Sequence, residues 1–239
     1  MRKVYALSAL LLAMFVLAGG CVESPDVNVE SEKTLGINGG VTVHYSGEVS
    51  TDQAKALINL INAELNPPDE IDVYVKKDNG YTVGLTSTYK SSSEMEDSLK
   101  FYLIFLASKM SQDVFNSHKV LLQVLDDEKN VLYQVESRYR YVSLNDINVW
   151  YTEASEEEAQ KVLNYLLDFA GSGPWDVILE KNGSTYHVRA MSSFKTAEEA
   201  NSAKDTYMEL VSGLEERLNG DVVVHVLDPD GKEVAVFEG

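Results

Sequence analysis

The sequence predicts an α+β fold made of two tandem copies of one two-layer sandwich. The chain has 239 residues, enough for two domains of about 100 residues each. Two stretches, Val41–Glu136 and Ile147–Glu238, carry similar segments in the same order. Within each stretch, short β-rich runs alternate with helical segments that bear one apolar stripe. Such helices pack on one face of a sheet, so we expect two layers in each copy.

The repeat is carried by four pairs of matched segments. Their order, their lengths and the residues at their turns are preserved, which favours duplication over a chance likeness of secondary structure. We therefore assign residues 41–141 to the first α+β repeat and residues 142–239 to the second. The pairs are VTVHYS at Val41 with INVWYT at Ile147, DVYVKKDNGYTV at Asp72 with DVILEKNGSTYHV at Asp176, STYK at Ser87 with SSFK at Ser192, and VLLQVLDDEKNVLYQVE at Val120 with VVVHVLDPDGKEVAVFE at Val222.

Each copy opens with a short alternating strand followed by a helix. Ser50 and Ser155 stand where these helices begin, and acidic residues follow in the first turn, as capping and the helix dipole favour. Pro67-Pro68 and the run Gly171–Pro174 end the two helices, because proline lacks the N–H that a helix interior needs. The apolar stripes are Ala54, Leu57, Ile58, Ile61 and Leu65 in the first copy, and Ala159, Val162, Leu163, Leu166 and Ala170 in the second.

A hairpin, a second helix and a final hairpin complete each copy. Asp78–Gly80 and Asn182-Gly183 are strong turn signals for the first hairpins, and the last hairpins turn at Asp126–Asn130 and at Asp228–Gly231. The resulting order is β-α-β-β-α-β-β. Its first six elements resemble the ferredoxin-like split β-α-β sandwich, in which two helices cover an antiparallel sheet, and the extra strand would extend one edge. Segment spacing leaves the strand order open.

Residues 1–20 predict a secretory signal peptide. Arg2 and Lys3 form a short positive region, Tyr5–Ala18 is almost continuously apolar, and two glycines follow. The apolar run is shorter than the roughly 20 residues that a membrane-spanning helix needs. Cys21, the only cysteine of the chain, comes next.

The run Leu17–Cys21 resembles the lipobox of prokaryotic lipoproteins, and it is similar to the Ala-Gly-Gly-Cys endings of many archaeal surface lipoproteins. The resemblance implies that the Cys21 thiol receives a diacylglyceryl-type group and that the chain is cut just before it. The protein is then expected at the extracytoplasmic face of the cell membrane, held by a two-chain lipid anchor. Ordinary cleavage, and an uncleaved helix with an incidental cysteine, are the alternatives.

Residues 21–40 predict a flexible, lipid-anchored linker, because they are polar, acidic and interrupted by Pro25 and three glycines. The whole chain has 38 acidic and 20 basic residues and a net charge of −18. This charge repels phosphate backbones, so nucleic acid is not an expected partner. It also keeps the folded part away from an anionic lipid surface, so we expect contact with the membrane through the anchor at Cys21.

The candidate binding surface lies near the junction of the two copies. Tyr133, Tyr139 and Tyr141 alternate along what is predicted to be one strand, and Arg138 and Arg140 fall on its other face. These side chains could line a surface for a peptide or a glycan, so the expected partner is a protein or glycan at the cell surface. The alternative is ordinary cross-strand packing of the aromatic rings.

No cofactor, metal site or catalytic residue is predicted. None of the four histidines pairs with another at metal-ligand spacing. Asp228–Gly231 is better explained as a hairpin turn with a left-handed glycine than as a calcium loop. Asn182-Gly183-Ser184 is an N-glycosylation sequon on a turn expected to be exposed, with Asn182 as the acceptor. The histidines are His44, His118, His187 and His225.

Together, these features favour a non-enzymatic binding or assembly module. The alternative is a surface hydrolase that uses dispersed carboxylates, with or without a metal. A solute-binding subunit of a transporter fits less well, because such proteins usually have longer α/β lobes. A deep polar cleft with converging carboxylates would favour the enzyme. A flat or grooved aromatic surface beside an exposed sheet edge would favour binding by strand addition.

Overall fold

The computed structural model describes residues 32–37, 40–67, 70–77 and 79–239. They form two compact units. The first unit consists of the described residues up to Met95 together with Met110–Ser137, and the second consists of Glu96–Lys109 and Arg138–Gly239. Within these described ranges, no helix has both the length and the apolarity that crossing a membrane requires.

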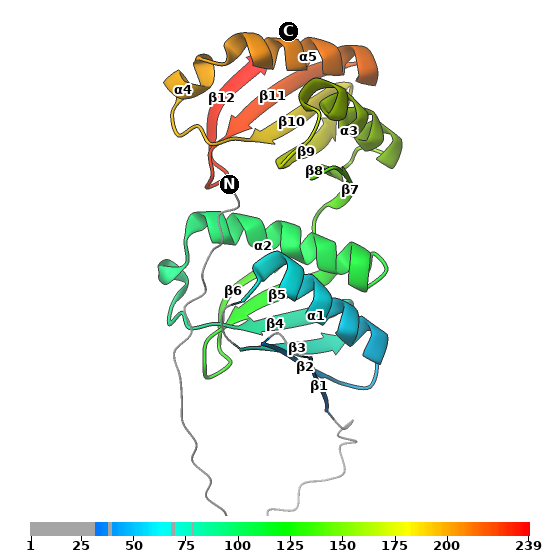
Figure 1. Ribbon diagram of the computed structural model, residues 1–239, viewed down its shortest axis with the longest axis vertical. Coiled ribbons are helices and arrows are strands. Elements are labelled where there is room, and N and C mark those ends of the chain that lie inside the picture. Colours follow the sequence, from blue (N-terminus) through cyan, green and yellow to red (C-terminus); the bar gives the residue numbers. More distant parts are fainter. Residues whose placement is uncertain (1–31, 38–39, 68–69, 78) are drawn as a thin grey trace, which may run out of the picture. The chain divides into compact units, whose positions relative to one another are not determined.

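The first unit is built on a six-stranded sheet with the order β1-β2-β3-β4-β5-β6 (Figure 1). Alternate residues of each central strand are buried, as in β2, where Val41, Val43 and Tyr45 are at most 5% exposed. Helix α1 (Thr51–Leu65) buries Ala54, Leu57, Ile58 and Ile61 of its predicted stripe. The strands are β1 (Lys33–Ile37), β2 (Val41–Tyr45), β3 (Ile71–Lys77), β4 (Tyr81–Thr86), β5 (Val120–Leu125) and β6 (Val131–Glu136).

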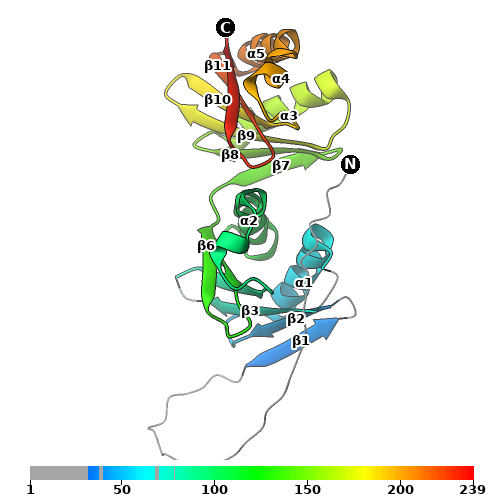
Figure 2. The same ribbon diagram turned by 90° about the vertical axis from the view of Figure 1, so that its left-hand side faces the viewer.

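The second unit contains a six-stranded sheet with the order β12-β11-β10-β9-β8-β7. Helices α3 (Glu156–Ala170) and α5 (Lys204–Leu218) cover one of its faces (Figure 2), and the short helix α4 (Ala197–Asn201) precedes α5. Alternate residues of the central strands point to this covered face and form the main core with the two helices. The strands are β7 (Arg140–Leu144), β8 (Ile147–Thr152), β9 (Trp175–Asn182), β10 (Thr185–Met191), β11 (Asp221–Leu227) and β12 (Glu233–Glu238).

Helix α2 (Asp97–Lys109) belongs to the second unit by its contacts, although the repeat places it in the first copy. A short 3-10 helix, η1 (Ser92–Glu94), precedes α2, and a π-helical segment, η2 (Met110–Val114), follows it in the first unit. Phe105 of α2 packs against Trp150 and Ile178 of the second sheet. We call this side of the second sheet, which faces away from α3 and α5, the outer face. It carries Trp150, Ile178, Glu180, His187, Arg189 and His225.

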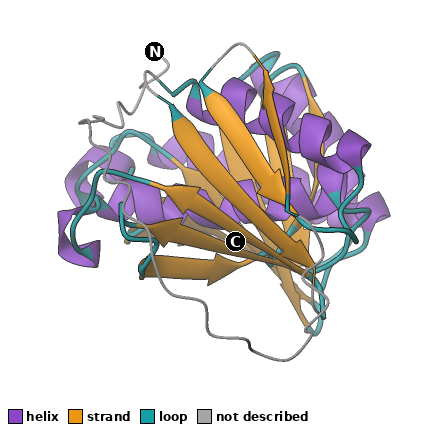
Figure 3. Ribbon diagram, turned by 90° about the horizontal axis from the view of Figure 1, so that it is seen from below, coloured by secondary structure: helices purple, strands orange, loops and turns teal. Residues whose placement is uncertain are grey.

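The α+β class and the tandem arrangement are confirmed, because both sheets have the same strand order and the same alternation of pairing. Within each unit the helices form a layer beside the sheet (Figure 2), and Figure 3 distinguishes the helices (purple) from the strands (orange). The sheets are mixed, however, and not antiparallel throughout as in the ferredoxin-like expectation. In the first sheet β2 is parallel to β3 and β4 is parallel to β5, with no strand inserted between either pair. Each crossover therefore joins neighbouring strands, and the α1 stripe lies over the sheet that its own strands form.

Matching hydrogen bonds in the two units support the duplication. The N–H and the hydroxyl of Ser87 both donate to the Leu125 carbonyl at 2.9 Å, and Ser192 does the same to Leu227 at 2.9 Å. The register shifts at the same place in both last hairpins, next to Leu125 and next to Leu227. Ser50 and Ser155 each form a capping box with the residue three positions on, as their predicted place at the helix start suggests.

Each sheet begins with one strand more than the predicted order contains. In the first unit this strand is β1, which comes from the segment predicted as a linker and pairs antiparallel with β2. In the second unit it is β7, which pairs with β8. Residues 33–37 are therefore part of the folded body, because antiparallel pairing with β2 provides hydrogen-bond partners for their backbone N–H and C=O groups.

We expect Ser50→Ala to lower the free energy of unfolding of the first unit by about 1 kcal/mol. The Ser50 hydroxyl accepts the Gln53 N–H at 3.1 Å, and alanine would leave that helix N–H without its cap. Ser50→Asp keeps an acceptor and serves as the matched control. Chemical unfolding followed by circular dichroism gives the measurement. Both tryptophans, Trp150 and Trp175, lie in the second unit, so an unchanged fluorescence transition would confine the effect to the first.

Candidate functional site

The predicted anchor residue, Cys21, lies outside the described residues, so the lipidation site stays a prediction. The predicted binding surface is described in full. The structure divides it between the two units: Tyr133 lies in β6 of the first, whereas Tyr139 and Tyr141 belong to the second. The expectation of one continuous strand is wrong, because the chain leaves β6 at Glu136 and enters the second sheet at Arg140.

Tyr139 and Tyr141 pack in an aromatic cluster on the outer face of the second sheet. The Tyr139 ring stacks on Phe105 with centroids 5.9 Å apart, and Tyr141 lies 4.9 Å from Trp150. Trp150 is 2% exposed, and its indole N–H donates to Asp176 at 2.9 Å. Burial raises the pKa of the Tyr139 hydroxyl. These rings therefore hold α2 against the second sheet, which is the packing role that was the alternative to binding.

A buried serine fixes the chain where it enters the second unit. Ser108 of α2 is fully buried, and its hydroxyl donates to the Ile104 carbonyl at 2.8 Å. The same oxygen accepts the backbone N–H groups of Arg138 and Tyr139, both at 3.2 Å. The positions of Arg138 and Tyr139 are thus set by α2 as well as by the sheet.

Two arginines converge on one carboxylate beside the aromatic cluster. Arg138 Nη2 lies 3.4 Å from Glu180 Oε1, and Arg189 Nε lies 3.0 Å from Glu180 Oε2. The Arg138 side chain is 64% exposed and also lies over the Tyr139 ring at 5.5 Å. Arg140, in contrast, lies over Tyr151 at 5.1 Å, a residue of the main core on the other face. Both arginines are exposed, and Arg138 is the one that lies beside Glu180.

A histidine pair lies on the same face of the second sheet and connects β10, β11 and β12. His187 Nδ1 lies 3.0 Å from His225 Nε2, and His225 Nδ1 lies 2.6 Å from Glu233 Oε2. The separation in sequence hid this pair, because the two histidines are 38 residues apart and meet through the parallel pairing of β10 with β11. At the matched positions the first repeat has Thr82 and Gln123, so the pair is specific to the second unit.

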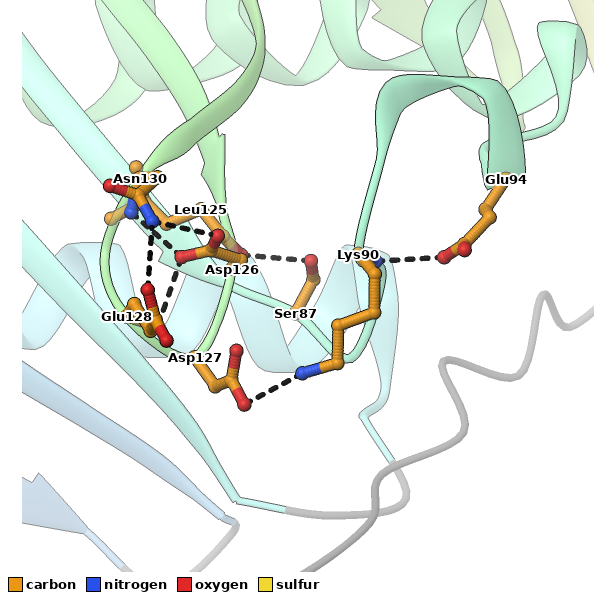
Figure 4. Close-up of polar contacts among 8 residues, drawn as sticks. All are labelled: Ser87, Lys90, Glu94, Leu125, Asp126, Asp127, Glu128 and Asn130. Carbon is orange, nitrogen blue, oxygen red and sulfur yellow. Dashed lines mark hydrogen bonds and ion pairs between the residues drawn. The ribbon is translucent and has the colours of Figure 1, made fainter.

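The acidic turn after β5 is stabilised by hydrogen bonds among its own residues (Figure 4). Asp126 Oδ1 accepts the N–H groups of Glu128 at 2.9 Å and Asn130 at 2.7 Å, and the hydrogen bond from the Asn130 side chain helps to lower the pKa of Asp126. Lys90 Nζ lies 2.6 Å from Asp127 Oδ2. These carboxylates are engaged in shaping the turn and in pairing with lysine.

In the matched turn of the second unit, the first aspartate likewise accepts hydrogen bonds from two backbone N–H groups. Asp228 Oδ1 accepts the N–H groups of Asp230 and Lys232 at 2.9 and 2.8 Å, and Gly231 has a φ of +79°. The hairpin-turn interpretation of Asp228–Gly231 is therefore confirmed. In the part of the chain that the structure describes, no group of three or more histidine, cysteine, aspartate or glutamate side chains is arranged to hold a metal ion.

The predicted sequon lies on an exposed turn. Asn182 is the last residue of β9, and it is exposed together with Gly183 and Ser184. Gly183 has a φ of +63°, which suits a tight hairpin. The Asn182 side chain is thus exposed on its own unit, and glycosylation itself stays a prediction.

Comparison with two solved structures shows only distant likeness. A sex pheromone precursor from Lactobacillus salivarius subsp. salivarius is 12% identical with a TM-score of 0.26, over 69% of this chain and 61% of that chain. The sex pheromone staph-cAM373 precursor is 11% identical with a TM-score of 0.23, over 79% of this chain and 92% of that chain. At these TM-scores neither structure carries an argument about this protein.

Sequence comparison is more informative. An uncharacterized protein of Archaeoglobus fulgidus is 31% identical over 240 residues, which cover 99% of this chain and 98% of that protein. The AF_1994_N family model, described as a family N-terminal domain, matches residues 34–137 and 141–226. The two matched stretches correspond to the two repeats and begin close to β1 and β7. The chain belongs to the family that the AF_1994_N model defines.

Proposed function

We propose that the protein is a lipoprotein held through Cys21 at the extracytoplasmic face of the cell membrane, and that its folded body is a non-enzymatic binding or assembly module. The lipobox-like run Leu17–Cys21 supports the anchor. The relative from Archaeoglobus fulgidus aligns over 99% of the chain, a span that takes in this segment. The anchor would place both repeats beside the membrane, where their partner would be met.

The placement of exposed apolar side chains carries the binding part of the proposal. Among the described residues, three large hydrophobic side chains are strongly exposed: Val131 at 48%, Leu144 at 52% and Val236 at 45%. Val131 lies in β6, Leu144 in β7 and Val236 in β12, and each of these strands ends its sheet. Exposed apolar residues on an edge strand favour pairing with another chain.

Strand addition is the binding mode that fits such an edge. An edge strand uses one side of its backbone within the sheet and leaves the other side for a further extended segment. β12 pairs through one side with β11, and its Val236 side chain stands beside exposed carboxylates at Glu233 and Glu238. A matching partner would be an extended peptide that alternates apolar and basic residues.

Site-specific photocross-linking on the membrane-bound protein tests the binding mode. A photoreactive residue placed in turn at Val131, Leu144 and Val236 is expected to give an adduct of reproducible mass at one or more of these positions, identified by mass spectrometry. Glu157 is the matched control, because its side chain is 80% exposed but lies on helix α3. Equal adducts at Glu157, or none at Val131, Leu144 and Val236, would exclude binding at an edge.

A charged edge supplies a second readout. Val236→Lys in a protein that carries the photoreactive residue at a neighbouring position of β12 should abolish that adduct, because a lysine on an edge strand opposes pairing. The same lysine should leave an adduct at Val131 unchanged, since Val131 lies in the other sheet.

A further inference from the structure

The geometry points to a divalent transition-metal site at His187 and His225, on the outer face of the second sheet. The inference does not depend on the binding mode proposed above, although Glu233 of β12 takes part in both. It rests on three observations: the distance between two imidazole nitrogens, the carboxylate behind one of them, and the rigid strands that carry both.

The distance between the two nitrogens suits a shared metal ion. His187 Nδ1 and His225 Nε2 are 3.0 Å apart. Two metal–nitrogen bonds of about 2.0–2.1 Å that meet at an angle between square-planar and tetrahedral would separate their nitrogens by about 2.8–3.4 Å. An N–H···N hydrogen bond also fits this distance, and a metal ion would take the place of the shared proton once both rings turn so that their nitrogen lone pairs converge on it.

Glu233 orients His225 for this role. Glu233 Oε2 lies 2.6 Å from His225 Nδ1, which favours the tautomer with its proton on Nδ1. The Nε2 lone pair of His225 then faces His187. A carboxylate that binds the second nitrogen of a histidine is the usual support of a metal ligand.

The scaffold holds the two rings in place. β10 and β11 are adjacent parallel strands, and the His225 side chain is only 14% exposed. Glu180 of β9 lies beside His187 and pairs with Arg138 and with Arg189, which stands next to His225 in the pairing of β10 with β11. Water would complete the coordination sphere, because His187 and His225 are the only ligands that this arrangement supplies.

Imidazole ligands favour the later ions of the first transition row, and affinity rises to copper. We therefore choose Cu²⁺ and Zn²⁺ as probes for the full chain, purified in detergent without a histidine tag. Cys21→Ser removes the single thiol from any protein that has not received the lipid. Calorimetry should show one Cu²⁺ per chain, and the electron paramagnetic resonance spectrum should show coupling to two imidazole nitrogens.

The variants separate a built site from surface binding. His187→Asn and His225→Asn should each weaken Cu²⁺ and Zn²⁺ binding at least about tenfold, and Glu233→Gln should weaken it by about tenfold through the orientation of His225. His44→Asn is the matched control, because His44 also contacts a carboxylate, at 2.9 Å from Asp72, but has no second histidine beside it. It should leave the affinity unchanged.

Several results would overturn the inference. These are no saturable binding, equal affinity in all the variants, or a spectrum with a single coupled nitrogen, which would leave the pair as a hydrogen bond between strands. Circular dichroism of each variant checks that folding is retained. Such a failure would leave the lipid anchor and the edge-strand proposal untouched, since neither depends on His187 or His225.

Discussion

Cys21→Ala is expected to move the protein from the detergent phase to the aqueous phase and to abolish lipid attachment. In the proposed mature form, Cys21 carries the lipid, and it is the only cysteine of the chain, so no other thiol can take the modification. The net charge of −18 gives the body no attraction to an anionic membrane surface. Loss of the two acyl chains would therefore remove essentially all of the binding energy.

Detergent partitioning, metabolic labelling with a lipid precursor and mass spectrometry of the N-terminus give the measurements. The protein with its original Cys21 should begin at this residue and carry an added lipid mass. The Cys21→Ala variant should lack that mass. Ser24→Ala, three residues beyond the cysteine, is the matched control and should keep both the lipid and the membrane fraction. An unchanged mature size and unchanged partitioning in Cys21→Ala would refute the anchor.

Glu158→Gln is expected to lower the free energy of unfolding of the second unit by about 3 kcal/mol near neutral pH. Glu158 Oε1 accepts from Lys181 Nζ at 2.7 Å and from the Tyr186 hydroxyl at 2.5 Å, and Oε2 accepts the Ser155 N–H at 2.7 Å. Burial opposes ionisation, but the hydrogen bonds from Lys181, Ser155 and Tyr186 outweigh it and lower the pKa of Glu158 to about 2. Glutamine keeps the shape of the capping box and removes the charge.

The effect should disappear in acid. The folded pKa of about 2 lies below the ordinary value of 4.5, so the ionised carboxylate stabilises the fold fully above about pH 4.5. This contribution is lost as the pH falls from 4.5 towards 2, where the variant and the parent protein should become equally stable. Unfolding monitored by tryptophan fluorescence across this range gives the measurement.

The chain offers two references for this prediction. Glu157→Gln changes the neighbouring residue, whose side chain is 80% exposed and pairs with Lys161, and it should shift the stability by less than about 0.5 kcal/mol. The first unit naturally has Gln53 in the place of Glu158, where the amide contacts the Tyr81 hydroxyl at 3.2 Å. A pH-independent loss in Glu158→Gln would show that the charge is not the source of the stability.

Features set by nearby residues were well predicted from the sequence. Ser50 and Ser155 begin helices because a side-chain oxygen three residues before a backbone N–H can cap it, whatever the rest of the fold does. The apolar stripes of α1 and α3 follow from helical spacing alone. The turn at Asp228–Gly231 needs only its own aspartate and a left-handed glycine.

Features that depend on contacts between distant residues could not be predicted from the sequence. Tyr139 and Tyr141 alternate as a surface would, but they pack against the cluster of Phe105, Trp150 and Ile178, and nothing in their own segment shows these partners. The segment that forms β1 has the composition of a linker. It is a strand because its backbone pairs with β2, and that pairing is not visible in its own side chains. His187 and His225 meet only once β10 and β11 are known to be parallel neighbours in one register.

The sequence by itself determined the duplication, the starts and ends of helices α1 and α3, the turns and the acidic character of this protein, because these depend on composition and on contacts within a few residues. The tertiary structure decided which strands are neighbours, that α2 packs on the second sheet, and that two histidines, two glutamates and two arginines share its outer face. Those arrangements depend on backbone pairing and packing between segments far apart in the chain, which no local pattern of residues encodes.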